Sequence, residues 1–161
     1  MAGSEQTGID AARADLFEDT VCILTPEKET PLRDVEETRQ FWAVLGCRMR
    51  SLSPAEHDEV IALVSHLPHL VAATLVNLVC SQNPDSLNFS GNGFRDTTRV
   101  ASGSPEMWTE IFGGNREQVR KALGAMIEKL RHVAEFIDDD AKMRQFLTEA
   151  KTRRDDLRKE K

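Results

Sequence analysis

The first run of residues that could carry chemistry is Ser65-His66-Leu67-Pro68-His69, which interrupts an apolar helical pattern. Pro68 cannot donate to the carbonyl four residues earlier, so it predicts a kink in the helix. Ser65 and His69 fall on one face at that kink, while His66 is turned about 100° away by the helical repeat. A kink leaves a free carbonyl and room for a ligand. An equally good explanation is that both histidines are structural and hydrogen-bond to backbone or carboxylate groups.

The second run begins with Gly91-Asn92-Gly93, whose backbone amides suit the close approach of an anion. Arg95 and Arg99 follow and share a face if the segment is helical, with Asp96 as an opposing charge. Guanidinium groups suit bidentate recognition of carboxylates. The alternative is a pair of surface arginines beside a loop, but the glycines and the apolar surroundings favour a ligand site. Together the two runs predict a site for a small dianionic substrate.

Other chemistries are less well supported by the sequence. His66 and His69 could share a metal ion, but no nearby Cys, Asp or Glu completes a ligand set, so we predict no metal. The pair His57-Asp58 is typical of metal phosphohydrolases, but such a site needs ligands from other helices and only His132 remains. Asp58 in the first turn of a helix is better explained as a favourable charge near the positive end of the helix dipole.

Composition restricts the class of protein. The chain has 161 residues, which suits one domain or one domain plus part of another. Its net charge of −6 argues against nucleic acid as a partner. Three widely spaced cysteines fit free thiols in a reducing compartment. No signal peptide is evident, and the apolar stretch 70–80 is too short to span a bilayer. We expect a cytoplasmic protein that binds neither nucleic acid nor membrane.

The elements that must position the two runs divide the chain near residue 52. Residues 20–26 predict a strand that Pro26 closes, a helix opens at Thr30-Pro31 and stops at Gly46, and residues 47–52 predict a second strand. A lone strand–helix–strand unit cannot bury both faces of its sheet. This segment therefore needs additional sheet beside it.

The pattern from residue 53 onward is helical. Ser53-Pro54-Ala55-Glu56 is a capping box, and the helix that follows is apolar nearly all round as far as Val79, which predicts a buried central helix. Further helices are expected from Ser104-Pro105, over residues 116–137, where apolar residues recur at spacings of three and four, and from about residue 141. The chain is therefore mainly α.

Several of these segments, taken in order and spacing, resemble the prephenate/arogenate dehydrogenase family. The residues that carry the resemblance are Ser65–His69, Gly93–Arg99, Pro105–Trp108, Asn115-Arg116 and the opening Met1–Glu5, which is similar to the end of the family's His-Pro-x-Ala-Gly-Ser/Thr-Glu motif. The resemblance covers essentially the whole chain. It implies a Rossmann domain that binds NAD or NADP, followed by an all-helical domain that forms an intertwined homodimer and completes the substrate site.

The resemblance also implies roles for individual residues. Substrate-binding residues would be Ser65, His69, Asn92, Arg99 and Trp108, and an ionic network would include Glu5, Arg95 and Asp96. Arg99 would anchor the ring carboxylate of the substrate. Asn92 departs from the pattern, because family members commonly have glycine there. The family's catalytic histidine would lie two positions before Met1, so the chain itself holds no catalytic residue, and Met1 matches an internal family position, which indicates a truncated chain.

The expected fold is a helical dimerisation domain of the 6-phosphogluconate-dehydrogenase-like C-terminal type over residues 53–161. A short α/β remnant of a Rossmann domain precedes it over residues 1–52. The full-length parent would convert prephenate to 4-hydroxyphenylpyruvate in tyrosine biosynthesis, with tyrosine as a candidate inhibitor. This chain alone would be inactive because it contains no glycine-rich dinucleotide fingerprint. The alternatives are an arogenate dehydrogenase, a two-domain dehydrogenase of a hydroxy acid, or a non-catalytic helical dimerisation module.

Overall fold

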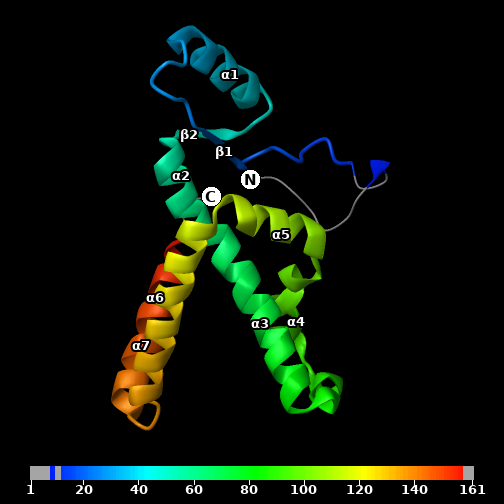
Figure 1. Cartoon of the computed structure of the whole chain (residues 1–161), viewed down its shortest axis with the longest axis vertical. Coiled ribbons are helices and arrows are strands. Elements are labelled where there is room, and N and C mark those ends of the chain that lie inside the picture. The colour runs from blue at the N-terminus through cyan, green and yellow to red at the C-terminus, as the bar shows by residue number, and fades with distance from the viewer. Residues whose placement is uncertain (1–7, 10–11, 158–161) are drawn as a thin grey trace. The chain divides into compact units, whose positions relative to one another are not determined.

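The computed structural model describes residues 8–9 and 12–157 and consists of two compact units, residues 1–120 and 121–161. The first unit is mainly helical with a short two-stranded sheet, which confirms the expected fold class (Figure 1). Its elements are β1 (Val21–Leu24), α1 (Leu32–Val44), β2 (Arg48–Ser51), α2 (Pro54–Ile61), the π-helical turn η2 (Ala62–His66), α3 (Leu67–Gln82), the 3-10 turn η3 (Pro84–Phe89), α4 (Asn92–Thr98), the 3-10 turn η4 (Arg99–Ser102) and α5 (Pro105–Gly114).

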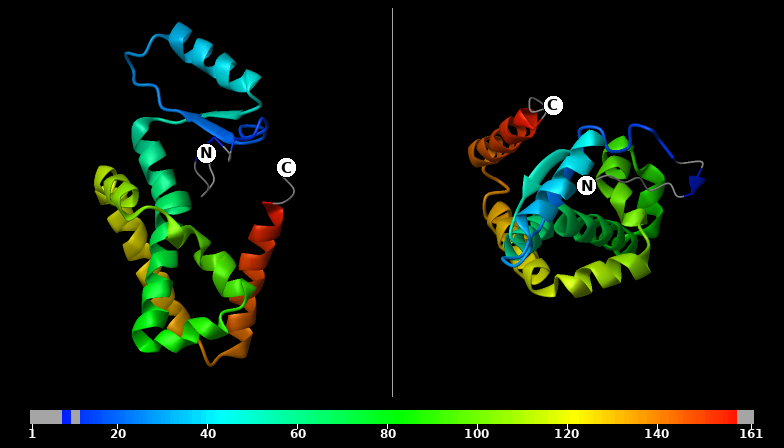
Figure 2. Two further views of the ribbon diagram at one scale, coloured as in Figure 1. Left: turned by 90° about the vertical axis from the view of Figure 1, so that its right-hand side faces the viewer. Right: turned by 90° about the horizontal axis from the view of Figure 1, so that it is seen from above.

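β1 and β2 pair in parallel, in register from Val21 opposite Arg48 to Leu24 opposite Ser51. Parallel strands need a crossover, and α1 supplies it and covers one face of the sheet (Figure 2). Pro31 was expected in the first turn of this helix, but it is the N-cap of α1, which begins one residue later at Leu32. Gly46 ends the connection with φ of +86°, a backbone conformation that favours glycine.

The helical rod of α2, η2 and α3 starts at the predicted capping box. The Ser53 Oγ accepts from the backbone N–H of Glu56 (3.3 Å), and the Glu56 carboxylate accepts from the backbone N–H of Ser53 (2.8 Å). The first helical turn therefore satisfies its free amides locally. Elements η3, α4 and η4 return along α3, and each contacts it.

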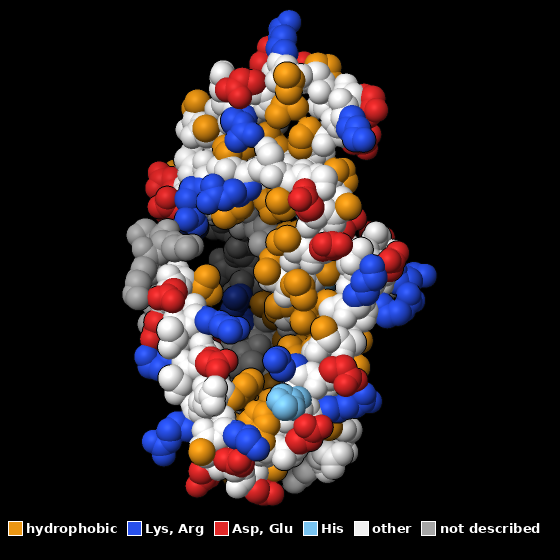
Figure 3. Space-filling model, turned by 90° about the vertical axis from the view of Figure 1, so that its left-hand side faces the viewer, with side chains coloured by type: hydrophobic (Ala, Val, Ile, Leu, Met, Phe, Trp, Pro, Cys, Tyr) orange, Lys and Arg blue, Asp and Glu red, His pale blue; other side chains and the backbone are white. Residues whose placement is uncertain are grey.

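The prediction of a buried central helix is wrong for this chain by itself. Leu63 and Val64 are 54% and 56% exposed, and hydrophobic side chains also reach the surface drawn in Figure 3. The helical rod of residues 54–82 is 29 residues long with a mean hydropathy of 1.6 in its most apolar window, one third of which is buried. By length and composition it could cross a membrane, so the argument from a short apolar stretch does not hold. Core helices of soluble proteins meet the same criterion.

The second unit contains most of α6 (Arg116–Glu135), which starts in the first unit, and α7 (Asp140–Asp156). Residues 136–139 join the two helices, which diverge from this turn in both views of Figure 2. Phe136 is buried at the turn, with its ring centroid 6.0 Å from that of Phe146 and 5.3 Å from that of His132. A hollow of about 430 Å³ beside these residues is lined by none of the predicted site residues.

Candidate functional site

The run around Pro68 folds as a π-helical turn inside an otherwise α-helical rod. In η2 the backbone N–H of Leu67 donates to the carbonyl of Ala62, five residues earlier. An α-helical turn would drive the proline ring against the carbonyl of Val64. The wider π turn is a known way of relieving such a conflict, and π turns occur frequently at functional sites. The predicted irregularity is therefore present, in the form of an inserted turn.

His66 and His69 both face α5, and the expectation that His66 is turned away from the site is wrong. Both rings are buried, each residue being 6% exposed. His66 and His69 are three residues apart, and residues at this spacing are neighbours on a helix surface. The expectation considered only the spacing of His66 from Ser65. Ser65 itself is half-buried.

The imidazole of His69 stacks on the indole of Trp108, with ring centroids 3.7 Å apart and planes inclined by 16°. His66 meets the same indole edge-on, at 6.3 Å and 86°. Phe112, one turn later on α5, lies 6.1 Å from both histidine rings. Edge-on aromatic pairs, such as those that His66 makes, contribute beyond their buried area. The structure thus brings together His69 and Trp108 of the predicted site and adds Phe112.

Gly103 lies against this stack, a role that the sequence did not reveal. A Cβ atom at Gly103 would lie 2.5 Å from Nε1 of Trp108 and 3.2 Å from Cε1 of His69. Both distances are shorter than ordinary van der Waals contact, so only glycine fits here without a shift of the indole. Ser104 is the N-cap of α5, the helix that carries Trp108, and its Oγ accepts from the backbone N–H of Met107 (3.2 Å).

The surroundings of the two buried histidines favour the uncharged form of each ring. Burial is the main cause that lowers the pKa of His66 below its usual value; the charge of His57 adds to the effect and the charge of Asp58 opposes it. Burial alone lowers the pKa of His69. The Nδ1 atom of His69 is buried and has no hydrogen-bond partner among the described residues.

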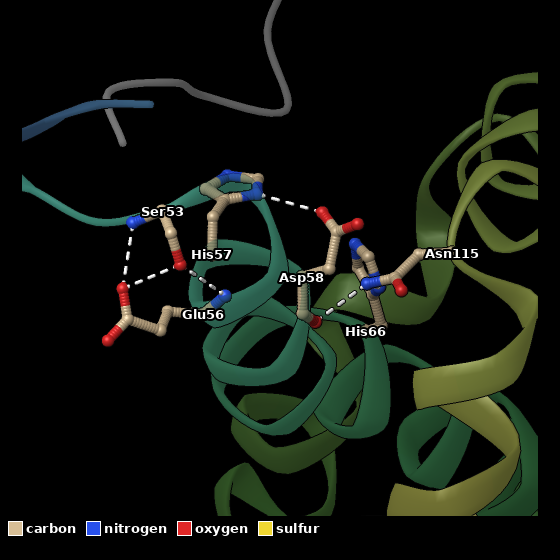
Figure 4. Close-up of polar contacts among 6 residues, drawn as sticks. All are labelled: Ser53, Glu56, His57, Asp58, His66 and Asn115. Carbon is tan, nitrogen blue, oxygen red and sulfur yellow. Dashed lines mark hydrogen bonds and ion pairs between the residues drawn. The ribbon is translucent and has the colours of Figure 1, made fainter. Parts of the chain in front are cut away.

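His66 is linked to a second part of the chain through Asn115. The Nδ2 atom of Asn115 donates to the backbone carbonyl of Asp58 (2.8 Å) and lies 3.5 Å from Nδ1 of His66 (Figure 4). The neighbouring His57 pairs through Nδ1 with the Asp58 carboxylate at 3.0 Å. The pair His57-Asp58 therefore lies in the first helical turns as expected. Within residues 8–9 and 12–157, no group of three His, Cys, Asp or Glu side chains could hold a metal ion.

The arginine run forms α4 and η4. Gly91 is the N-cap of α4, and Thr98, which is buried, closes the helix through its Oγ1 to the carbonyl of Phe94 (2.7 Å). Both elements contact α3, the helix that carries His69. The predicted binding and network residues of this run, Asn92, Arg95, Asp96 and Arg99, are all exposed. Glu5 lies outside the described residues. The assigned roles of these residues stay predictions.

The connection from β1 to α1 does not fit the phosphates of a dinucleotide. Such a site needs a glycine-rich turn between a strand and the N-terminus of the next helix, so that the backbone can approach the pyrophosphate. The connection from β1 to α1 runs through Thr25-Pro26 and Thr30-Pro31, and it contains no glycine. This connection therefore lacks the glycine-rich turn on which such a phosphate site depends.

Comparison with known proteins places the chain in a family. The family model described as "Prephenate dehydrogenase, dimerization domain" matches residues 53–151, and "Prephenate dehydrogenase, nucleotide-binding domain" matches residues 1–51. A prephenate dehydrogenase of Bacillus subtilis is 39% identical over 98% of this chain and 44% of its own length.

Solved structures agree with this match. The prephenate dehydrogenase of Aquifex aeolicus, in complex with hydroxyphenyl propionate and NAD+, superposes with a TM-score of 0.89 at 35% identity, over 98% of this chain and 57% of that one. The arogenate dehydrogenase of Synechocystis gives a TM-score of 0.82 at 29% identity, over 97% and 59% of the two chains. The chain thus spans about half the length of these relatives. On the match of the dimerization-domain model to most of its length, the chain belongs to the prephenate dehydrogenase family.

Proposed function

We propose that this chain contributes the substrate-binding part of a prephenate dehydrogenase, an enzyme that oxidatively decarboxylates prephenate to 4-hydroxyphenylpyruvate in tyrosine biosynthesis. The observation that carries the proposal is the match of the two family models, in order, to residues 1–51 and 53–151. We propose the corresponding division into domains over residues 1–52 and 53–161. The longer protein would use NAD or NADP, work in the cytoplasm, and respond to tyrosine as an inhibitor.

The proposed reaction is favoured by the loss of carbon dioxide, which makes the ring aromatic, so it needs little covalent catalysis. What the protein must supply is orientation of the substrate and stabilisation of its charges. In our proposal Arg99 binds the ring carboxylate, and Arg95 and Asp96 belong to a surrounding ionic network with Glu5. His69, held flat on Trp108 at 3.7 Å, forms an ordered wall beside the half-buried Ser65.

The chain alone is expected to show no dehydrogenase activity, since it contains no glycine-rich dinucleotide fingerprint. A steady-state assay with prephenate and NAD or NADP tests this directly. Turnover above background by the isolated chain would contradict the proposal that the reaction needs the longer protein.

The exposed apolar side chains support a homodimer. The dimerization-domain model covers residues 53–151, a range in which large hydrophobic side chains are exposed on several helices: Val60, Leu63, Val64, Leu78, Leu123, Ile127 and Leu130. Apolar area of this extent is costly to leave in water. We propose that a second copy of the chain covers it, which also accounts for the apolar rod 54–82 without a membrane.

An arogenate dehydrogenase is the second candidate, and the similarity to the Synechocystis enzyme favours it. Prephenate and arogenate differ in the side chain, which ends in a keto acid in one and an amino acid in the other. The ring carboxylate is common to both, so Arg99 serves either substrate. Competition between prephenate and arogenate for the isolated chain, measured by calorimetry, distinguishes the two candidates.

The decisive experiment is ligand binding by Arg99→Ala, with Arg33→Ala as the matched control. Arg33 is an exposed arginine on α1 that pairs with the exposed Glu37 (2.7 Å). Loss of a charged hydrogen bond costs about 1.5–3 kcal/mol, so Arg99→Ala should weaken prephenate binding by about tenfold or more. Arg33→Ala should leave it unchanged. If the unsubstituted chain dimerises but binds neither prephenate nor arogenate, it is a non-catalytic dimerisation module and the proposal fails.

A further inference from the structure

Asn115, for which the sequence predicts no role of its own, lies at the junction of two helices. It ends α5, and its carbonyl accepts from the backbone N–H of Val119 at the start of α6 (3.0 Å). Its side chain reaches back to α2 and η2, 57 and 49 residues earlier in the chain. One side chain thus joins the end of α5 to the π-helical turn beneath the predicted pocket (Figure 4).

The bond to Asp58 determines which way round the Asn115 amide lies. A carbonyl oxygen can only accept, so the group 2.8 Å from it must be the amino group of the amide. The same carbonyl also accepts from the backbone N–H of Ala62, where α2 passes into η2. Asn115 therefore supports the chain at the point where the regular helix gives way to the wider turn.

The same amino group faces Nδ1 of His66 at 3.5 Å. Because an amino group offers only hydrogens, it can donate to this imidazole nitrogen only where the nitrogen carries a lone pair, an arrangement that places the proton of the neutral ring on Nε2. The burial of His66 agrees with a neutral ring. Trp108 and Phe112, which meet the ring edge-on, carry no charge. His57 and Asp58 are the titratable groups that act on it.

We propose that Asn115 is a positioning residue for the ligand pocket: it fixes the π-helical turn and the Nε2–H tautomer of His66, and so sets the places of the flanking Ser65 and His69. Asn115 acts through the turn and through His66, without touching the ligand. The part of the proposal that concerns the pocket rests on the proposed function, whereas the part that concerns the tautomer does not.

The tautomer is measured by long-range ¹H–¹⁵N spectra of the histidine rings in the uniformly ¹⁵N-labelled 161-residue chain. The unsubstituted chain should show His66 as the Nε2–H tautomer near pH 7.5. Asn115→Asp replaces the donor with an acceptor, so it should raise the pKa of His66 by about one unit or more, as a nearby opposite charge does. Asn88→Asp, at an exposed position on η3, is the matched control and should change neither property.

The spectrum of the unsubstituted chain can overturn the proposal by itself, even if Asn115→Asp fails to fold. An Nδ1–H tautomer of His66 would refute it, as would an unchanged His66 pKa in a folded Asn115→Asp variant.

The pocket is tested separately with Asn115→Ala and prephenate, by calorimetry. Binding weakened about tenfold, with circular dichroism unchanged, supports the positioning role, and unchanged binding refutes it. If the unsubstituted chain binds no ligand while the tautomer is as expected, the proposed function fails and the role of Asn115 in fixing the turn and the tautomer stands.

Discussion

Gly103→Ala is the substitution whose effect can be worked out most directly from the structure. The added methyl carbon would lie 2.5 Å from Nε1 and 2.9 Å from Cδ1 of Trp108, and 3.2 Å from Cε1 of His69. Ordinary contacts begin near 3.4 Å, so the indole must retreat by about 1 Å if the backbone holds, since interiors are close-packed. Retreat on that scale separates the stacked rings.

The expected cost is about 1–3 kcal/mol, the range for adding a methyl group to a packed site. Gly114→Ala is the matched control, because a Cβ there meets nothing within 4 Å in the last turn of α5. Helix propensity predicts that this control is neutral or stabilising by up to about 1 kcal/mol. Both variants should be compared by urea unfolding at one protein concentration, because dimerisation makes apparent stability depend on concentration.

Nuclear magnetic resonance provides the second readout. The chain has only two tryptophans, and Trp42 packs apart from the site, against Phe17 and Phe41. In Gly103→Ala the indole N–H signal of Trp108 and the Cε1–H signal of His69 should move, while that of Trp42 stays. Equal stability of the two alanine variants, together with unmoved signals, would refute the packing argument.

Two further predictions concern pH and capping. Burial lowers the pKa of His66 and of His69 in the folded chain, so the unfolded chain binds more protons as the pH falls through the usual histidine value of 6.5. The stability that the two neutral rings contribute should therefore be fully present above that pH, and the free energy of unfolding should decline below it. Urea midpoints at pH 7.5 and 5.5 test this, and equal midpoints would contradict it. Ser53→Ala removes the N-cap of α2 and should cost about 1 kcal/mol in the same assay. Thr109→Ala, on the exposed surface of α5, serves as a comparison that removes no cap.

Local chemistry could be predicted from the sequence because it depends on neighbours in the chain. The capping box at Ser53, the stop at Gly46 and the strand–helix–strand unit are all present in the structure. Each rests on spacing within a few residues. The break at Pro68 was also evident, but a proline signals only that an α-helical bond is lost. It does not say whether the chain kinks or inserts a π turn.

The site depended on contacts that spacing cannot supply. Gly103 matters because Trp108 and His69 converge on its backbone, and Asn115 because it meets Asp58 from 57 residues away. The burial of the rod 54–82 was predicted wrongly for a similar reason. An apolar pattern predicts that the helix is covered, but it does not say whether the same chain or another one covers it. The roles of Asn92, Arg95, Asp96 and Arg99 depend on a ligand, and no geometry of the chain alone decides them.

The parallel pair of β1 and β2 has a consequence for handling the protein. An edge strand of a sheet presents backbone groups that can pair with another chain, which is a route to aggregation. Arg48 and Arg50 give β2 two like charges that repel a second copy. β1, with the sequence Val-Cys-Ile-Leu, contributes no charged side chain of its own. A charged substitution in that strand should therefore improve solubility before it improves stability.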